Sequence, residues 1–174
     1  MLGDMLGANM KFNNLQELRE LICLSNEFLN FAKRYYKKNI NMKFYCEDIF
    51  KISKKHNKNL IVLSGDKGNS LAFAPGYNIN SFKPGLGGTT IISAHRDTHF
   101  RFLEDVSLDD VFEVTDRNNK TTSYVVNDIR IIDSDQQDIA VYDNQAEIKL
   151  ITCYPFNAPI AGGPLRYIVT AKLI

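Results

Sequence analysis

Residues 147–173 contain two β-type runs on either side of a loop rich in proline and glycine. The letters read EIKLITC over residues 147–153, YPFNAPIAGGPL over residues 154–165 and RYIVTAKL over residues 166–173. Short runs bounded by such turn residues predict strands. If the two strands pair antiparallel, the last residue of the first, Cys153, lies beside the first residue of the second, Arg166. The stretch therefore predicts a thiol and a guanidinium at one mouth of a sheet.

Five further β-type runs precede this pair, separated by Gly, Pro, Asn and Asp residues. They are Leu60–Ser64, Ser70–Ala74, Thr89–His95, Val111–Asp116 and Thr121–Ile132. The Asn118-Asn119 pair predicts a hairpin between the last two. Helical segments between the runs are short or missing, which disfavours a doubly wound parallel sheet. We expect a mainly β domain over residues 59–174, closed as an antiparallel barrel.

The first 58 residues differ from the rest in being rich in Lys and Asn. Their apolar residues recur at helical spacings of three, four or seven: Leu15, Leu18, Ile22, Leu29, Ala32 and Tyr36. This period predicts an amphipathic helix, for which Asn14 is a suitable cap. We expect a helical appendage over residues 1–58 that packs on the barrel, with a helix on a membrane surface as the alternative. The segment Tyr45–Lys54 suits either a second helix or a strand.

The overall composition is that of a folded protein, with 44% hydrophobic and 24% charged residues among 174. Lys and Arg number 21 against 20 Asp and Glu, so no global charge favours nucleic acid as a partner. No apolar window is long enough to cross a bilayer, and no secretory signal is visible. The three cysteines are too few for a disulfide framework, and we expect Cys23 and Cys46 to be separate thiols, with a bridge as the alternative.

A third residue, His95, suits the same mouth as Cys153 and Arg166. It ends the predicted strand Thr89–His95, and a neighbouring strand with the direction of Glu147–Cys153 would bring it there. A cysteine becomes a strong nucleophile when a histidine takes its proton, and acyl transfer needs a donor where the oxyanion forms. Taken singly, each residue also has an ordinary structural interpretation: a buried thiol, a hydrogen-bonded histidine and a solvated arginine.

Three strings around these residues resemble the sortases, a family of cysteine transpeptidases with an eight-stranded β-barrel. They are IISAHRDTHF over residues 91–100, LITCYPF over residues 150–156 and GGPLRY over residues 162–167, in the family's order and spacing. LAFAPG over residues 71–76 resembles an early strand and loop near the family's substrate groove. Two departures stand out: Ala94 where Gly is usual before the histidine, and Tyr77 where His is common.

The resemblance implies a reaction and a role for each site residue. Cys153 would attack the Thr–Gly carbonyl of an LPxTG-like sorting signal on a protein substrate, and an amine acceptor would resolve the thioacyl enzyme. His95 would act as general acid and then as general base. Arg166 would steady the substrate and the oxyanion. We expect no cofactor and no metal, and the resemblance places a substrate-binding set beside these three: Thr152, Ala94, Ala72, Ala74 and Tyr154.

The resemblance also implies a subgroup and a location. The strings around Cys153 and Arg166 look most like the sortases of Gram-negative, often marine, bacteria. Sortases work at the extracytoplasmic face of the membrane, usually held by an N-terminal hydrophobic helix. The corresponding region of this chain is amphipathic and charged. The resemblance thus implies an extracytoplasmic protein whose anchor is missing or atypical, with a soluble protein as the alternative.

Two other functions compete with transpeptidation. A hydrolytic cysteine peptidase of the same fold would differ only in using water to resolve the thioacyl enzyme. A barrel that serves as an interaction module would do no chemistry, although it would be expected to lack one of His95, Cys153 and Arg166, and all three are present.

Metal chemistry is the weaker alternative. His95, His99 and Cys153 could form a zinc site, but no Glu follows His95 as in an HExxH motif, and Arg166 would have no role. The acidic run in residues 133–138 lacks the Gly and the terminal Glu of an EF-hand, so Asp133, Asp135 and Asp138 predict a solvated loop. Three phenylalanines are expected in the core or rim of the barrel: Phe100, Phe102 and Phe112.

Overall fold

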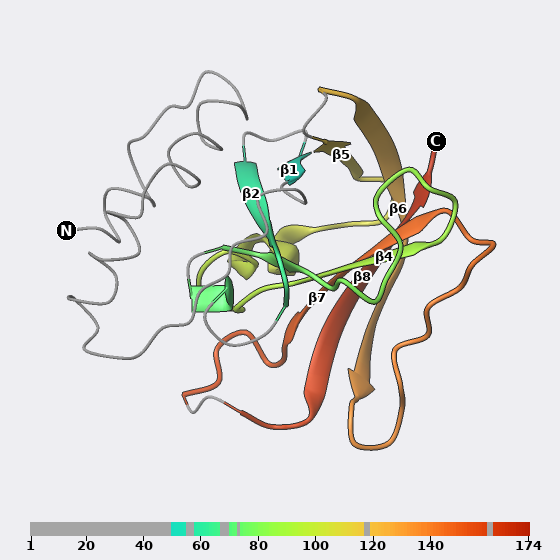
Figure 1. Cartoon of the computed structure of the whole chain (residues 1–174). Coiled ribbons are helices and arrows are strands. Elements are labelled where there is room, and N and C mark those ends of the chain that lie inside the picture. Colours follow the sequence, from blue (N-terminus) through green and yellow to red (C-terminus); the bar gives the residue numbers. More distant parts are fainter. Residues whose placement is uncertain (1–49, 55–57, 67–69, 73, 117–118, 160–161) are drawn as a thin grey trace, which may run out of the picture.

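The computed structural model describes residues 50–54, 58–66, 70–72, 74–116, 119–159 and 162–174 (Figure 1). Eight strands and two short 3-10 helices form in these residues: β1 (Phe50–Lys54), β2 (Lys58–Ser64), η1 (Ser70–Ala72), β3 (Gly76–Tyr77), β4 (Thr89–Ser93), η2 (Arg101–Asp105), β5 (Val111–Thr115), β6 (Thr121–Asp133), β7 (Glu147–Cys153) and β8 (Leu165–Leu173). The amphipathic helix expected after Asn14 lies outside this part of the chain, as do Cys23 and Cys46. No helix of the described residues has the length and apolar character needed to cross a membrane.

The strands close into a barrel in the order β1-β2-β3-β4-β7-β8-β6-β5, and β5 pairs back to β1. The closed barrel agrees with the sequence analysis, but the expectation of a purely antiparallel one is wrong. The pairs β2–β3 and β4–β7 are parallel, and the other six are antiparallel. β6 ends at the same end of the barrel as β4, and residues 134–146 return the chain to the other end, so β7 begins there and runs in the same direction as β4.

Most of the predicted strands are present with shifts of a residue or two at their ends. Ser70–Ala74 is the exception, because its first three residues form the helix η1 and only the two-residue strand β3 follows. In the undecided segment Tyr45–Lys54, the described residues Phe50–Lys54 form the strand β1, and residues 45–49 lie outside the described part of the chain. β1 lies within the range assigned to the appendage although it belongs to the barrel. The hairpin between β5 and β6 is confirmed, with Asn119 in the left-handed region at φ 61°.

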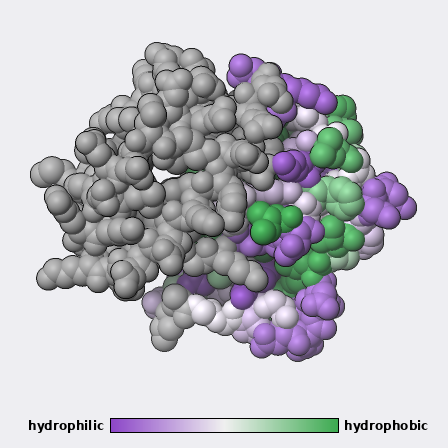
Figure 2. All heavy atoms as spheres, viewed as in Figure 1, coloured by the Kyte–Doolittle hydropathy of each residue, from purple (hydrophilic) through white to green (hydrophobic). Residues whose placement is uncertain are grey.

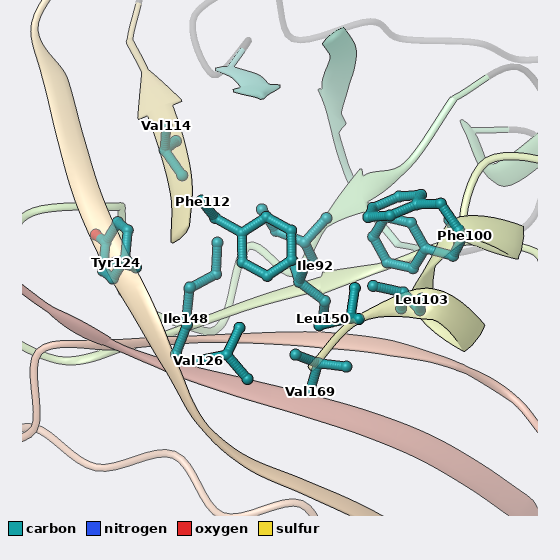
Figure 3. Close-up of a cluster of buried hydrophobic side chains, with 14 of the residues drawn as sticks. Ile92, Phe100, Leu103, Phe112, Val114, Tyr124, Val126, Ile148, Leu150 and Val169 are labelled. Atoms are coloured by element: carbon teal, nitrogen blue, oxygen red, sulfur yellow. The ribbon is translucent and has the colours of Figure 1, made fainter. Parts of the chain in front are cut away.

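The main core fills the barrel interior with alternate residues of the strands. Figure 3 shows inward-pointing side chains from neighbouring strands meeting there, among them Ile92, Phe112, Val126 and Leu150. The connection between β4 and β5 completes this core with four residues from around η2: Phe100, Phe102, Leu103 and Val106. The three phenylalanines predicted for the core are buried and meet edge to face. Burying such a side chain contributes about 1.5–3 kcal/mol.

A second, smaller core lies on the outer face of the sheet β4-β7-β8-β6. Residues that alternate with the inward set point outward, and one isoleucine from each of these four strands packs there: Ile91, Ile132, Ile151 and Ile168. Ile139, from the segment between β6 and β7, packs against this cluster. The outer face of this sheet is therefore covered, unlike the solvated outer face of a simple barrel.

The cover is the connection of residues 134–146, which we call the strap. β6 and β7 each pair antiparallel with β8, so they run in the same direction. Strands of the same direction need a long crossover connection to return the chain to the starting end. The strap therefore leaves β6 beside the first residues of β8 and travels the length of the barrel to Glu147.

The described surface is otherwise mixed. Figure 2 shows hydrophobic residues in small groups between hydrophilic ones on the face it presents. Among described residues, the large apolar side chains with most exposure are Ile79, Leu86, Leu108 and Ile174. Scattered exposed apolar residues of this kind are ordinary on soluble proteins.

Tyr124 supplies a first prediction, on stability. Its ring is buried in the core, and its hydroxyl accepts a hydrogen bond of 2.9 Å from the Gly85 N–H. Replacing Tyr124 with Phe should lower the free energy of unfolding by about 1 kcal/mol at neutral pH, because that N–H loses its acceptor.

The Tyr124→Phe effect should shrink in alkali. Burial raises the pKa of Tyr124 above its ordinary value, although the hydrogen bond from Gly85 opposes this. Between the ordinary and the raised pKa, the folded protein thus keeps the Tyr124 hydroxyl proton, whereas the unfolded chain releases it. The resulting stability is complete below about pH 10 and is lost as pH rises through the raised pKa. Denaturant titrations at neutral pH and at about pH 10.5 should show the two proteins converging; a constant difference would contradict the assignment.

Candidate active site

Cys153 and Arg166 lie directly opposite each other in the sheet. β7 and β8 pair antiparallel, and their register joins Cys153 to Arg166 as the last pair before the loop. Thr152 and Tyr167 are the adjacent residues in the two strands, and they lie on the inner side of the barrel. Cys153 shares its face with Ile151 and so points to the outer side of the barrel. The predicted pairing of the two strands is therefore confirmed.

His95 reaches the same end of the sheet from β4. β4 runs parallel to β7 with Ser93 opposite Ile151, and the Ala94 N–H continues the ladder by donating to the Ile151 carbonyl at 3.2 Å. Continuing this register by two residues brings His95 level with Cys153. The His95 side chain is exposed, whereas Cys153 and Arg166 are half-buried. The chain path thus brings His95 to the end of the sheet at which Cys153 and Arg166 pair.

Arg166 is held by backbone carbonyls of its own loop. Its Nη1 donates to the Gly163 carbonyl at 2.7 Å and to the Leu165 carbonyl at 3.0 Å. One nitrogen of the guanidinium is thereby occupied in fixing the side chain. The remaining nitrogens carry donors that can serve a bound carbonyl or oxyanion beside Cys153.

The strand ends at the site are tied together by Thr152 and Ala94, two of the residues predicted to bind substrate. The Thr152 hydroxyl donates to the Ala94 carbonyl at 2.7 Å, and both residues are buried. The Ala94 side chain lies in the main core. These two side chains therefore face the barrel interior and join β4 to β7 immediately before His95 and Cys153.

The other three predicted substrate-binding residues lie at or near this end. Ala72 is exposed at the end of η1, and Ala74 is half-buried two residues before Gly76, which pairs with Ser93 at the end of β4. Tyr154 follows Cys153 directly, and its N–H donates to the Leu165 carbonyl at 3.0 Å.

An aromatic group stands behind the nucleophile on the inner side. Tyr154 stacks on Tyr167 with ring centroids 6.1 Å apart, and Phe156 meets Tyr167 edge to face at 5.0 Å. Burial raises the pKa of Tyr167, and nearby Tyr154 and Glu104 raise it further, so its hydroxyl stays protonated at neutral pH. These rings fix the first residues of the loop after Cys153 against β8.

Two arginines of the β4–β5 connection also hold this loop, and sequence reasoning missed both. Buried Arg96 donates from Nη2 to the Ala158 carbonyl at 3.1 Å. Arg101 donates from Nη1 to the Phe156 carbonyl at 3.3 Å and to Asn157 Oδ1 at 2.8 Å. The segment after His95 is thus tied to the segment after Cys153. Two charged residues directly after a strand, such as Arg96 and Asp97, are normally exposed to solvent. No local pattern therefore predicted this contact.

The predicted acidic loop has no metal-binding arrangement in the described residues. No group of three or more His, Cys, Asp or Glu side chains there is placed to hold a metal ion. The Asp133 carboxylate accepts hydrogen bonds from the Asp135 N–H at 2.9 Å and from Gln136 Nε2 at 3.1 Å, while Asp135 and Asp138 are exposed. Asp133 therefore closes the turn that begins the strap.

Comparison with known proteins identifies the family to which this architecture belongs. The sequence pattern of the sortase domain matches residues 51–174. Sortase D of Bacillus subtilis (strain 168) is 29% identical over 121 residues, which are 69% of this chain and 60% of that protein. The chain thus spans about 60% of the length of this curated relative.

Solved structures show the same fold. Sortase A from Corynebacterium diphtheriae is similar with a TM-score of 0.63 at 25% identity, over 86% of this chain and 69% of that chain. A sortase D5 transpeptidase of Clostridium perfringens gives a TM-score of 0.64 at 22% identity, over 84% of this chain and 88% of that chain. The domain pattern, the fold and the resemblance of the strings around His95, Cys153 and Arg166 agree, and this chain belongs to the sortase family of cysteine transpeptidases.

Proposed function

We propose that this protein cleaves an LPxTG-like sorting signal between Thr and Gly and transfers the acyl group to an amine acceptor. One observation carries the proposal: Cys153 lies opposite Arg166 in the register of β7 and β8, at the end of the sheet to which β4 brings His95. A nucleophile, an acid–base and a permanent donor at one end of the sheet are the parts that acyl transfer requires.

In the proposed mechanism Cys153 Sγ, as thiolate, attacks the Thr carbonyl carbon and forms a tetrahedral intermediate. Arg166 stabilises the negative oxygen with guanidinium N–H groups that the loop carbonyls leave available. As the intermediate collapses, the C–N bond to Gly breaks and His95 donates a proton to the leaving amine. An acceptor amine then attacks the thioester, His95 takes its proton, the C–S bond breaks and the thiolate returns.

The proposed peptide site uses the five predicted substrate-binding residues in two ways. Ala72, Ala74 and Tyr154 would contact the peptide, because they lie at the surface or half-buried at this end of the barrel. Thr152 and Ala94 would instead hold the catalytic residues in place, since their hydrogen bond joins the strand ends that precede Cys153 and His95.

We further propose where the protein works and how it is divided. By family membership the reaction belongs on the extracytoplasmic face of the membrane, on a protein substrate with a C-terminal sorting signal. The appendage over residues 1–58 and the barrel over residues 59–174 remain our division, with β1 as a barrel strand from the first range. The Gram-negative subgroup rests only on the strings around Cys153 and Arg166; the sortases reported above give it no support.

The test of this function is the intact mass of the protein after mixing with an LPxTG-type peptide and triglycine. The chain has three cysteines, so a Cys23→Ala/Cys46→Ala variant gives the matched background in which Cys153 is the single thiol. We expect a mass increase equal to the acyl fragment, and a ligated peptide in solution. The adduct should vanish when Cys153 is also replaced by Ala.

The outcomes separate the competing functions. Cleavage without ligation, with a range of amines, would favour the hydrolytic peptidase of the same fold. If neither adduct nor cleavage forms with any peptide of this type, while iodoacetamide still labels Cys153, the proposed substrate is wrong. A barrel in which Cys153 resists both peptide and reagent would fit an interaction module.

A further inference from the structure

The outer face of β7 carries a buried ion pair at the end opposite Cys153. Glu147, Lys149, Ile151 and Cys153 alternate along this face, and the first two side chains are only 4% and 2% exposed. Lys149 Nζ lies 3.1 Å from Glu147 Oε1. Lysine and glutamate are rarely buried so completely, and a pair that is buried needs further hydrogen bonds to offset its lost hydration.

Those further hydrogen bonds come from the strap and from β4. Lys149 Nζ donates to the Ala140 carbonyl at 2.7 Å and lies 4.9 Å from the centre of the Tyr142 ring. On the other side of the pair, the Thr89 hydroxyl donates to Glu147 Oε1 at 2.9 Å. The Tyr142 N–H in turn donates to that hydroxyl oxygen at 3.0 Å. The ion pair is therefore a latch for the strap, made of Thr89, Ala140, Tyr142, Glu147 and Lys149.

The other end of the strap is fixed beside Arg166. The Ser134 N–H and hydroxyl both donate to the Pro164 carbonyl, at 2.9 and 2.7 Å. Asp133 pairs with Leu165, and Ile132 pairs with Arg166 itself. The strap is therefore fixed on both sides of its middle, by the latch and by these contacts beside Arg166.

The middle of the strap forms the apolar surface next to the nucleophile. Ile139 packs on the isoleucine cluster of the outer face, whose members Ile151 and Ile168 are two residues from Cys153 and Arg166 respectively. Ala140, whose carbonyl Lys149 holds, is the next residue in the chain. The latch thus holds the residue next to Ile139 in the chain.

We propose that Lys149 is a positioning residue for the transpeptidation site. By holding Ala140 and Tyr142 it keeps Ile139 on the outer face, where the strap and the cluster form one wall beside Cys153 and Arg166. Lys149 touches neither the reacting atoms nor His95 in this arrangement. Its loss should therefore weaken peptide binding and leave the reactivity of the thiol unchanged. This inference rests on the proposed function for its kinetic part.

The test compares Lys149→Met/Glu147→Gln with the wild type. The double variant removes both charges together, which avoids stranding a buried carboxylate and keeps a folded protein for measurement. Lys172→Met is the matched control, since Lys172 is an exposed lysine of β8 that pairs with Glu147 in the register. Lys149→Arg keeps the charge and should recover part of any loss.

Two readouts define the expected result. Amide exchange at Tyr142 should become about tenfold faster in the double variant, because the strap loses its hold, and should stay unchanged in Lys172→Met. The KM for the sorting peptide should rise about tenfold while kcat and the rate of Cys153 alkylation by iodoacetamide stay within about threefold of wild type. Lys149→Arg should give values between the two.

Each failure has a separate meaning. Unchanged exchange at Tyr142 would show that Lys149 does not hold the strap. Faster exchange with an unchanged KM would show that the strap does not position the site, and either result overturns the inference. A fall in kcat and alkylation together would indicate a direct effect on Cys153, which also contradicts it. If the wild type itself turns over no sorting peptide, the proposed function fails, while the exchange result still decides whether the latch exists.

Discussion

Replacing Cys153 with Ala is expected to abolish turnover of a sorting peptide, with at least a 10⁴-fold loss of kcat/KM and no thioacyl adduct. The reaction passes through a bond to Sγ, and alanine offers no atom that can form it. The other parts of the site cannot compensate, because His95 and Arg166 act on an intermediate that never forms. The measurement is peptide cleavage followed by chromatography, with wild-type protein diluted to define the detection limit.

The Cys153→Ala protein should remain folded, which makes the loss a chemical one. Cys153 is half-buried on the outer face and outside the main core, and its place in the sheet depends on backbone pairing with Arg166. We expect a change of less than about 1 kcal/mol in the free energy of unfolding. The Cys23→Ala/Cys46→Ala variant is the matched control and should keep its activity. Measurable turnover by Cys153→Ala would remove Cys153 from the mechanism.

The barrel and its catalytic edge could be anticipated from sequence because both depend on local signals. Runs of β-formers between turn residues located seven strand regions, and six of them are strands in the structure. The placement of Cys153 beside Arg166 needed only the assumption of a hairpin, since strand ends that share a loop must be neighbours. His95 was placed there because it ends another predicted strand, and the resemblance to sortases then gave all three residues a role.

What could not be anticipated depends on contacts between distant segments. The parallel pairing of β4 with β7 follows from the path of the chain, which no residue pattern of either strand encodes. Ser70–Ala74 has strand-like letters but forms a turn of 3-10 helix before the short strand β3. Arg96 and Lys149 look like surface charges in the sequence. Both are buried, because each donates a hydrogen bond to a backbone carbonyl elsewhere in the chain.

Arg166→Lys is expected to lower kcat by about 10²–10³-fold, which is the loss typical when an oxyanion donor is removed. The structure explains why a retained charge does not suffice. Arg166 already uses Nη1 to bind the Gly163 and Leu165 carbonyls, and its remaining nitrogens are free of those loop carbonyls and available for the substrate. A lysine has one nitrogen for both tasks, so it either leaves the loop unheld or leaves the oxyanion unpaired.

The control for Arg166→Lys is Arg130→Lys, on the neighbouring strand β6. Arg130 is exposed and pairs with Ile168 in the register, and its Nε lies 3.2 Å from Asp128 Oδ2. It is therefore also an arginine on a strand that pairs in this sheet, but it lacks the loop contacts of Arg166. Its replacement should leave kcat within about twofold. Steady-state kinetics on one peptide compare the two directly. If Arg166→Lys raised KM at constant kcat, Arg166 would bind the peptide equally in ground and transition states, and the oxyanion role would pass to another donor. A loss in kcat confined to Arg166→Lys, with Cys153 alkylation unchanged, is the result that the fork geometry requires.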